Sequence, residues 1–334
     1  MTVNVKLFDS LADVMADAGD ALDRSQQPSL YDRIAWFEMT SKHCGSDERS
    51  PLVARALRGD SAAWLFLCRT GPRRAEALAS WYTLAFDVVR RGEDDSLLVA
   101  IAGALKELAL IELAPLANPE PIERAFETAD WKAVRAVWSE NWELQPPKDF
   151  ESFWEARPGK LRSTVKRKAK KANLEIAIHR AFDGQAWDDY RKVYAQSWKP
   201  EEGSWGFMRA FAESEGSAGA LRLGIAYRDG APVAAQLWHV ENGRATIHKL
   251  AYAENAKSYS PGSILSEAMF RHVIEEDQPD IIDYGTGSEP YKADWMDAPR
   301  PLYELKLYNP RQPRAWLPLL RHRFSGLVRR ASSD

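Results

Sequence analysis

The chain reads Tyr259-Ser260-Pro261-Gly262-Ser263-Ile264-Leu265 between a β-branched run that ends near Ala251 and an apolar-striped stretch typical of a helix. Serine, proline and glycine in this order predict a helix with Ser260 as its N-cap and Pro261 as its first residue. The amides of Gly262, Ser263 and Ile264 then point outward, where the helix dipole favours an anion. The first acid of the helix is Glu267. The segment predicts a phosphate-binding turn, with ordinary capping as the alternative.

A second β-branched run follows this helix. It reads Ile281-Ile282-Asp283-Tyr284-Gly285, and a glycine-broken loop then reads Gly287-Ser288-Glu289-Pro290-Tyr291-Lys292. This order gives a strand, a capped helix, a second strand and a loop that ends in a cation. Such a unit can hold a phosphorylated cofactor beside a sheet.

The order of these motifs resembles the CelD-like acetyltransferases of the GNAT superfamily, which are relatives of the Fem-type peptidoglycan aminoacyl transferases. The resemblance covers about residues 150 to 300 and rests on Asp229-Gly230-Ala231-Pro232-Val233-Ala234-Ala235, Tyr259-Ser260-Pro261-Gly262, Asp283-Tyr284-Gly285 and Tyr291-Lys292. The usual GNAT phosphate loop, Arg/Gln-x-x-Gly-x-Gly/Ala, is absent. The resemblance implies an α/β fold, a GNAT-type mixed sheet flanked by helices.

The same resemblance implies acetyl-CoA or another acyl-CoA as the donor. The donor would lie along the strand Ala245–Ala251, with its pyrophosphate over the first turn of the helix. The cofactor-binding residues expected from it are His248, Lys249, Leu250, Ser260, Gly262, Ser263 and Ile264. Strand alternation would place Thr246 and His248 on one face of that strand and Ile247 and Lys249 on the other.

Composition predicts a globular protein with one large or two ordinary cores. The 334 residues are 45% hydrophobic and include 13 tryptophans. An acid-rich N-terminal segment is unlike a signal peptide, and the longest apolar run, Leu97 to Leu105, is too short to span a bilayer. These features predict a cytoplasmic protein.

Metal chemistry is not expected from the sequence. The two cysteines form no Cys-x-x-Cys pair, and the six histidines form no His-x-x-x-His pattern. We therefore expect a mechanism without a metal.

The pattern of runs predicts two GNAT-like halves and a tail. Residues 1–145 form the first half, 146–310 the acyl-donor half and 311–334 a basic amphipathic tail. Strands are predicted at Leu52–Leu57, Ala63–Cys68, Leu78–Phe86, Leu110–Leu113 and Lys132–Trp142, then at Leu174–His179, Leu221–Tyr227, Pro232–Val240, Ala245–Ala251, Ile281–Tyr284 and Leu302–Tyr308.

The first half is expected to be a degenerate copy. The counterpart of its phosphate turn reads Arg91-Gly92-Glu93-Asp94-Asp95-Ser96. Carboxylates at the start of a helix occupy the favourable end of the dipole and repel a pyrophosphate. A structural role, or one wall of an acceptor site, is the expectation for this half.

Four residues are predicted to carry the chemistry of acyl transfer. Asp283 is the first candidate for the base or for orienting the amine, and a turn-capping role is its alternative. Tyr284 and Tyr291 are candidate acids, each equally able to be a core aromatic residue. Lys292 is a candidate to hold a phosphate or an oxyanion, with an exposed lysine as its alternative.

Gln236 and a basic helix are predicted to contact the acceptor. The helix covers Lys160–Lys171, where Arg162 and Lys166 lie on its charged face while Leu161 and Val165 lie on its apolar face. A solvated basic face is the alternative. The tail after residue 311 is also basic and amphipathic, so it can contact the inner face of an anionic membrane or pack against the body.

Together these features predict an acyltransferase that acts on an amino or hydroxyl group of a sugar or a cell-envelope or exopolysaccharide precursor. A Fem-type transferase that takes an aminoacyl group from tRNA is one alternative, with the basic helix on RNA phosphates. A catalytically silent, GNAT-shaped protein that binds a polysaccharide is the other.

Overall fold

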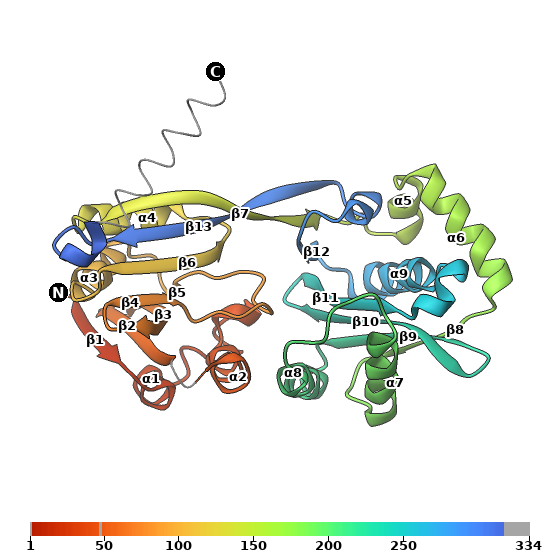
Figure 1. The fold of residues 1–334 in the computed structure, drawn as a ribbon, viewed down its shortest axis with the longest axis horizontal. Helices are drawn as coiled ribbons and strands as arrows, with labels where there is room; N and C mark the ends of the chain where they lie inside the picture. The colour runs from red at the N-terminus through yellow and green to blue at the C-terminus, as the bar shows by residue number, and fades with distance from the viewer. Residues whose placement is uncertain (1, 47–48, 317–334) are drawn as a thin grey trace, which may run out of the picture. The chain divides into compact units, whose positions relative to one another are not determined.

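The computed structural model describes residues 2–46 and 49–316 and divides into two compact units (Figure 1). One unit comprises residues 2–46, 49–139 and 301–316, and the other comprises residues 140–300. These bounds differ from the predicted halves at both ends of the second half. Residues 140–145 belong to the second unit, and residues 301–310 belong to the first, where residues 303–308 pair with β6. The predicted tail mostly lies outside the described residues, since only 311–316 of it are described.

The first unit is built on a mixed sheet with the strand order β1-β2-β3-β4-β6-β13-β7. Its elements are β1 (Asn4–Phe8), α1 (Leu11–Ala18), α2 (Ile34–Cys44), β2 (Ser50–Arg58), β3 (Ser61–Gly71), β4 (Arg74–Ala77), β5 (Val89–Arg91), α3 (Ser96–Ala104), β6 (Leu110–Leu116), α4 (Glu120–Thr128), the first part of β7 (Lys132–Leu144) and most of β13 (Ala298–Tyr308).

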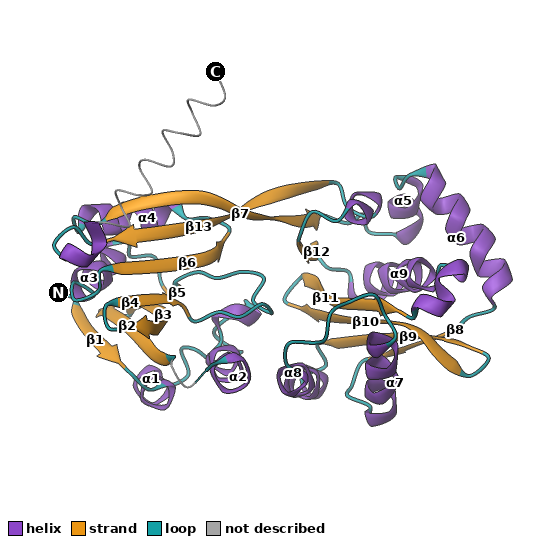
Figure 2. Cartoon of the chain, in the orientation of Figure 1, coloured by secondary structure: helices purple, strands orange, loops and turns teal. Residues whose placement is uncertain are grey.

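The second unit has the strand order β7-β12-β11-β10-β9-β8 (Figure 2). Its elements are the end of β7, α5 (Phe150–Glu155), α6 (Gly159–Ala172), β8 (Glu175–His179), α7 (Gly184–Ala195), α8 (Trp205–Ser217), β9 (Leu221–Arg228), β10 (Ala231–Glu241), β11 (Arg244–Tyr252), a 3-10 helix (Glu254–Tyr259), α9 (Pro261–His272), a π-helical turn (Val273–Asp277), β12 (Ile281–Thr286) and a 3-10 turn (Pro290–Asp294).

The two units repeat one topology. In each, four strands pair antiparallel in sequence order, and a helix then connects the fourth strand to a parallel neighbour. The parallel pair is β4 with β6 around α3 in the first unit, and β11 with β12 around α9 in the second. The predicted pair of GNAT-like halves is therefore confirmed.

In the second unit the sheet has helix α9 on one face and helices α7 and α8 on the other (Figure 1). The core on the α9 side contains Trp238, Leu265, Met269 and Phe270, all buried. Gly224 of β9 lies directly under α9, and a Cβ atom there would come within 2.4 Å of Met269 Sδ. The absence of a side chain at this position lets α9 approach the sheet closely.

Most predicted strands are present, but the strand predicted at Leu78–Phe86 is wrong, and strands β1, β4 and β5 and helix α8 were not predicted. Leu78–Phe86 is irregular, because the strand that precedes it, β4, already ends at Ala77. Helix α8 was not predicted, although Phe207, Met208 and Phe211 have helical spacing. In the described residues, no helix combines the length and hydropathy that crossing a membrane requires.

Replacement of Gly224 tests how tightly α9 packs on the sheet. We expect Gly224→Val to lower the free energy of unfolding by about 1–3 kcal/mol, since the added methyl groups force Met269 and Leu265 to move. Urea unfolding followed by circular dichroism measures this change. The control, Ala231→Val, places the same valine side chain at an exposed strand position and should alter stability by less than about 0.5 kcal/mol. Equal effects of the two variants would contradict the packing described here.

Candidate functional site

The parallel strands β11 and β12 separate soon after they begin to pair. Only Arg244, Ala245 and Thr246 pair with Ile281, Ile282 and Asp283, although β11 continues to Tyr252 and β12 to Thr286. Beyond Thr246, the edge of β11 that faces β12 has no strand partner in the described part of the chain. The two strands therefore form an open wedge in the sheet.

A β-bulge in β11 changes which side chains face the wedge. Leu237 and Trp238 of β10 lie opposite Lys249 and Ile247, which leaves His248 as the extra residue. As a result, Ile247 and Leu250, three positions apart, both pack on the α9 side of the sheet.

The predicted alternation along β11 was consequently wrong for Lys249. The Lys249 ammonium lies 3.1 Å from the Glu202 carboxylate, and the centroid of the His248 ring lies 4.8 Å from that of the Phe211 ring of α8. Of the three strand residues predicted to bind cofactor, only Leu250 lines the cavity described next.

A cavity of about 580 Å³ opens at the wedge and lies entirely within the second unit. Its walls come from β10, β11, β12, the start of α9, the 285–295 loop and α6. The lining residues are Leu161, Trp198, Gln236, Leu250, Ala251, Tyr252, Glu254, Lys257, Gly262, Ser263, Ser266, Tyr284, Glu289, Pro290, Tyr291, Asp294 and Trp295.

Helix α9 begins at Pro261 as predicted, but Ser260 does not cap it with its side chain. Ser260 has a left-handed backbone (φ 56°, ψ 45°), and its carbonyl accepts the Ile264 N–H at 3.2 Å. The Ile264 amide is therefore engaged. The amides of Gly262 and Ser263 have no hydrogen-bond acceptor within residues 2–46 and 49–316, and both residues line the cavity. Two backbone N–H groups of this turn are therefore available to a ligand, whereas the sequence predicted three.

The corresponding turn of the first unit differs in this respect. Asp94 accepts hydrogen bonds from the amide and the hydroxyl of Ser96 at 3.1 and 2.7 Å. Its other oxygen lies 2.5 Å from the Arg58 guanidinium. A carboxylate of the protein thus occupies the start of α3, as the acidic sequence predicts.

A buried polar network forms the floor of the cavity. The Gln236 amide donates to the Ser266 hydroxyl at 2.7 Å, and the Trp238 indole N–H donates to the Gln236 carbonyl at 2.9 Å. The Tyr284 hydroxyl is bonded to Ser266. Burial and the neighbouring Tyr291 raise the pKa of Tyr284 far above its usual value. Tyr284 therefore keeps its proton at neutral pH.

Asp283 is buried beneath the wedge and does not line the cavity. Its carboxylate accepts from the Gly285 amide at 2.8 Å and from the Asn141 side chain at 3.2 Å, and it pairs with Arg244 at 3.0 Å. Burial raises the pKa of Asp283 in spite of the Arg244 charge. The turn-capping contact expected as the alternative is present, while a role in proton transfer stays a prediction.

Lys292 is also buried, and its ammonium faces the loop backbone. It donates to the carbonyl oxygens of Gly285 and Thr286 and pairs with Glu289 at 3.1 Å. Burial lowers the pKa of Lys292. These contacts hold the loop that carries Glu289 and Tyr291 against the cavity, so an exposed lysine is excluded and a phosphate-binding role stays a prediction.

The cavity mouth contains residues that the sequence did not indicate. The rings of Trp198 and Tyr252 contact each other with centroids 4.4 Å apart, and Glu289 and Asp294 provide carboxylates beside Tyr291. Burial and Glu289 raise the pKa of Tyr291 to about 12. Glu289 belongs to the glycine-broken loop that the sequence analysis singled out, so the loop motif could have identified it. Trp198 comes from a distant segment, and no motif there predicts a place in the cavity.

The basic helix α6 packs its apolar face toward the cavity as predicted. Leu161 lines the cavity and Val165 is buried, while Lys166 is exposed. Arg162 donates to the Arg157 carbonyl at 3.1 Å, and the Lys168 ammonium donates to the Ser258 carbonyl at 2.5 Å. Contact of Arg162 and Lys166 with an acceptor stays a prediction.

Comparison with known proteins agrees with this geometry. Residues 159–293 match the family model described as an acetyltransferase (GNAT) domain. The segment has the GNAT fold. A match to an acetyltransferase model over the wedge, the α9 turn and the loop identifies the protein as an acyltransferase. The CelD-like subfamily stays a prediction, and no curated protein matches the sequence.

Solved structures of similar fold cover nearly the whole chain. The C-terminal domain of a putative lysylphosphatidylglycerol synthetase from Agrobacterium fabrum has a TM-score of 0.57 at 16% identity, covering 93% of this chain and 96% of that one. A protein of unknown function from Bacteroides thetaiotaomicron has a TM-score of 0.57 at 11% identity, with 91% and 99% covered. FemX has a TM-score of 0.54 at 9% identity, with 82% and 95% covered.

Lys199, next to the cavity residue Trp198, provides a test of the local electrostatics. Burial and the charge of Lys249 lower the pKa of Lys199 to about 8. Because the folded-state pKa lies below the ordinary value of about 10.4, the neutral amine is already abundant at pH 8. We expect labelling of Lys199 by an amine reagent, followed by mass spectrometry, to rise with a midpoint near pH 8. Exposed Lys148 is the control, and labelling of Lys199 with the same pH dependence as Lys148 would contradict the lowered pKa of Lys199.

Proposed function

We propose that the enzyme moves an acetyl or longer acyl group from acyl-CoA to an amino or hydroxyl group of a sugar or a cell-envelope or exopolysaccharide precursor. One observation carries the proposal: the cavity at the wedge of β11 and β12 ends at the two open amides of α9. An extended thioester with an anionic end matches such a site in both shape and charge.

The donor is oriented by backbone groups. Its diphosphate lies over the amides of Gly262 and Ser263, where the α9 dipole stabilises negative charge. The cavity residue Lys257 adds a cation nearby. The extended amide-bearing arm of the donor pairs with the open edge of β11 beyond Thr246, as a peptide adds to a sheet edge. The thioester then lies between Leu250 and Tyr284.

The chemistry requires one bond to form and one to break. The acceptor nitrogen or oxygen attacks the thioester carbonyl and releases its proton to water, from which Tyr284 regains a proton after each turnover, and the carbon–sulfur bond breaks as the carbonyl re-forms. Tyr284, protonated at neutral pH, gives its proton to the departing thiolate. Asp283 and Lys292 fix the turn that holds Tyr284, through their contacts with Gly285 and Thr286.

The acceptor enters at the cavity mouth. Aromatic rings of Trp198, Tyr252 and Tyr291 offer apolar faces, and the carboxylates of Glu289 and Asp294 accept hydrogen bonds from hydroxyl or ammonium groups. Burial opposes ionisation of Glu289, but the hydrogen bond from its own backbone amide and the Lys292 ammonium outweigh burial and lower the pKa of Glu289, so it is ionised at neutral pH. Flat apolar faces beside carboxylates support a sugar acceptor.

A Fem-type reaction with an aminoacyl-tRNA is the second candidate, and the exposed basic face of α6 favours it. Lys166, Arg167, Lys170 and Lys171 are all exposed on this helix. If these four cations each neutralise one phosphate of the tRNA, its affinity should fall with roughly the third to fourth power of the salt concentration. Retention of a labelled tRNA but not of CoA would favour this candidate over the first.

Introduction of charge at the α9 turn tests the donor site. We expect Ser263→Asp to weaken acetyl-CoA binding at least tenfold, because the new carboxylate lies where the diphosphate binds. Isothermal titration calorimetry with acetyl-CoA and with longer acyl-CoAs measures this loss. Gly184→Asp places the same charge in the first turn of α7 and should leave the affinity unchanged. Unchanged binding by Ser263→Asp, or no binding by the unmodified chain, would contradict the donor site.

Removal of a hydroxyl distinguishes the two candidate acids. We expect Tyr284→Phe to lower kcat about 100-fold with little change in KM for the donor, since only Tyr284 bonds to the buried Ser266. Tyr291→Phe, at the mouth, should lower kcat less than about threefold. Steady-state assays that follow free thiol release give both values. A larger loss of kcat in Tyr291→Phe than in Tyr284→Phe would identify Tyr291 as the general acid instead.

A further inference from the structure

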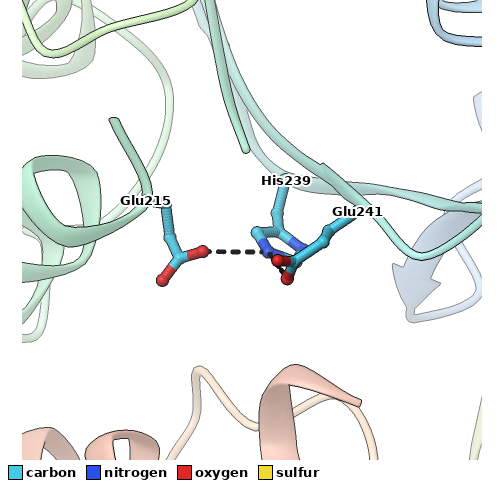
Figure 3. A group of neighbouring side chains, drawn as sticks. All are labelled: Glu215, His239 and Glu241. Carbon is cyan, nitrogen blue, oxygen red and sulfur yellow. Dashed lines mark ion pairs between the residues drawn. The ribbon is translucent and has the colours of Figure 1, made fainter. Parts of the chain in front are cut away.

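Three ionisable side chains converge on the α8 side of the second unit. Glu215 lies in the last turn of α8, and His239 and Glu241 lie two residues apart on β10, so they share one face of that strand. Figure 3 shows the two carboxylates directed at the imidazole. One donor atom from each residue lies within 4.8 Å of the other two.

This cluster is separate from the acyl-transfer site. Gln236 contacts Ser266 of α9 on the cavity side, whereas the His239 ring lies 6.1 Å from Phe211 of α8. The two side chains are three residues apart on one strand and therefore lie on opposite faces of the sheet. None of the three cluster residues lines the cavity.

The His239 side chain is buried with a ring nitrogen directed into the cluster. His239 is 5% exposed and Glu215 is 2% exposed. Nε2 of His239 lies 3.0 Å from Glu215 Oε2 and 3.6 Å from Glu241 Oε2, and it has no other hydrogen-bond partner within the described part of the chain. The other oxygen of Glu215 accepts from the Ser214 hydroxyl at 3.4 Å, which leaves Oε2 facing the imidazole.

These separations match those of ligands around one metal ion. Zinc binds imidazole nitrogen and carboxylate oxygen at about 2.0–2.2 Å, so two ligand atoms lie about 3.0 Å apart at a right angle and about 3.4 Å apart at the tetrahedral angle. The observed 3.0 and 3.6 Å bracket the tetrahedral value. Two carboxylates and a neutral imidazole with a divalent cation also form a group of zero net charge.

We propose that Glu215, His239 and Glu241 bind one divalent transition-metal ion, with zinc as the preferred ion and manganese as the weaker one. Mixed imidazole and carboxylate donors suit zinc better than magnesium or calcium, which take oxygen ligands. Three protein ligands leave a fourth position for water. The ion links the end of α8 to β10 behind the acyl-transfer site.

The electrostatics of the cluster favour positive charge. Burial opposes the imidazolium form of His239, but the carboxylates of Glu215 and Glu241 outweigh burial and raise the pKa of His239. A proton therefore competes with the metal ion for this position. The expectation of no metal rested on the absence of Cys-x-x-Cys, His-x-x-x-His and His-Glu patterns, whereas His239 and Glu241 are two residues apart on a strand and Glu215 comes from a separate helix.

Metal binding by the full chain tests the proposal. The protein is stripped with a chelator and titrated with zinc chloride or manganese chloride by calorimetry, and thermal unfolding is recorded with and without the ion. We expect one zinc ion per chain and a rise of roughly 5–10 °C in the unfolding midpoint at a hundredfold excess over Kd. Both effects should be lost in His239→Asn and in Glu241→Gln.

Glu213→Gln is the matched control, because Glu213 lies on α8 two residues before Glu215 and its side chain is 46% exposed. This variant should bind zinc as the unmodified chain does. Each variant is compared with its own metal-free form, so a change in basal stability does not mimic a loss of binding, and Glu241→Gln suffices if His239→Asn does not fold. No zinc or manganese binding by the unmodified chain, or full binding by Glu241→Gln, overturns the proposal and leaves a protonated His239 ion pair.

Discussion

The separation of β11 from β12 after the pair Thr246 and Asp283 is the constraint on which the rest of the site depends. A continuous parallel ladder would fill the edge of β11 with backbone hydrogen bonds and close the cavity. The bulge at His248 turns Leu250 and Tyr252 toward α9 while β10 keeps its pairing on the other edge. One extra residue thus opens the sheet without leaving β11 unsupported.

Buried polar residues around the wedge divide into those that hold the backbone and those that face the cavity. Asp283 and Lys292 bond to Gly285 and Thr286 and so fix the turn between β12 and the loop. Tyr284, on the opposite side of the same strand, faces the cavity. Because buried charges are costly without partners, the contacts of Asp283 and Lys292 account for their burial before any role in catalysis.

Duplication of the unit explains why the chain carries two similar helix starts with different chemistry. The first turn of α3 receives the carboxylate of Asp94, whereas the first turn of α9 presents the amides of Gly262 and Ser263 to a cavity. Both starts follow the fourth strand of an antiparallel ladder. Their difference is local and electrostatic, since the topology around them is the same.

The sequence by itself determined the order of most strands, the start of α9 at Pro261 and the acidic start of α3, because these depend on neighbouring residues. Glu289 and Tyr284 were within reach of motif analysis for the same reason. Only the tertiary structure decided that Lys249 turns away from the cavity, that Trp198 joins it, and that Glu215 meets His239 and Glu241. A bulge and the packing of distant segments set these positions. Neither changes the hydrophobic periodicity of the residues concerned, so neither can be predicted from it.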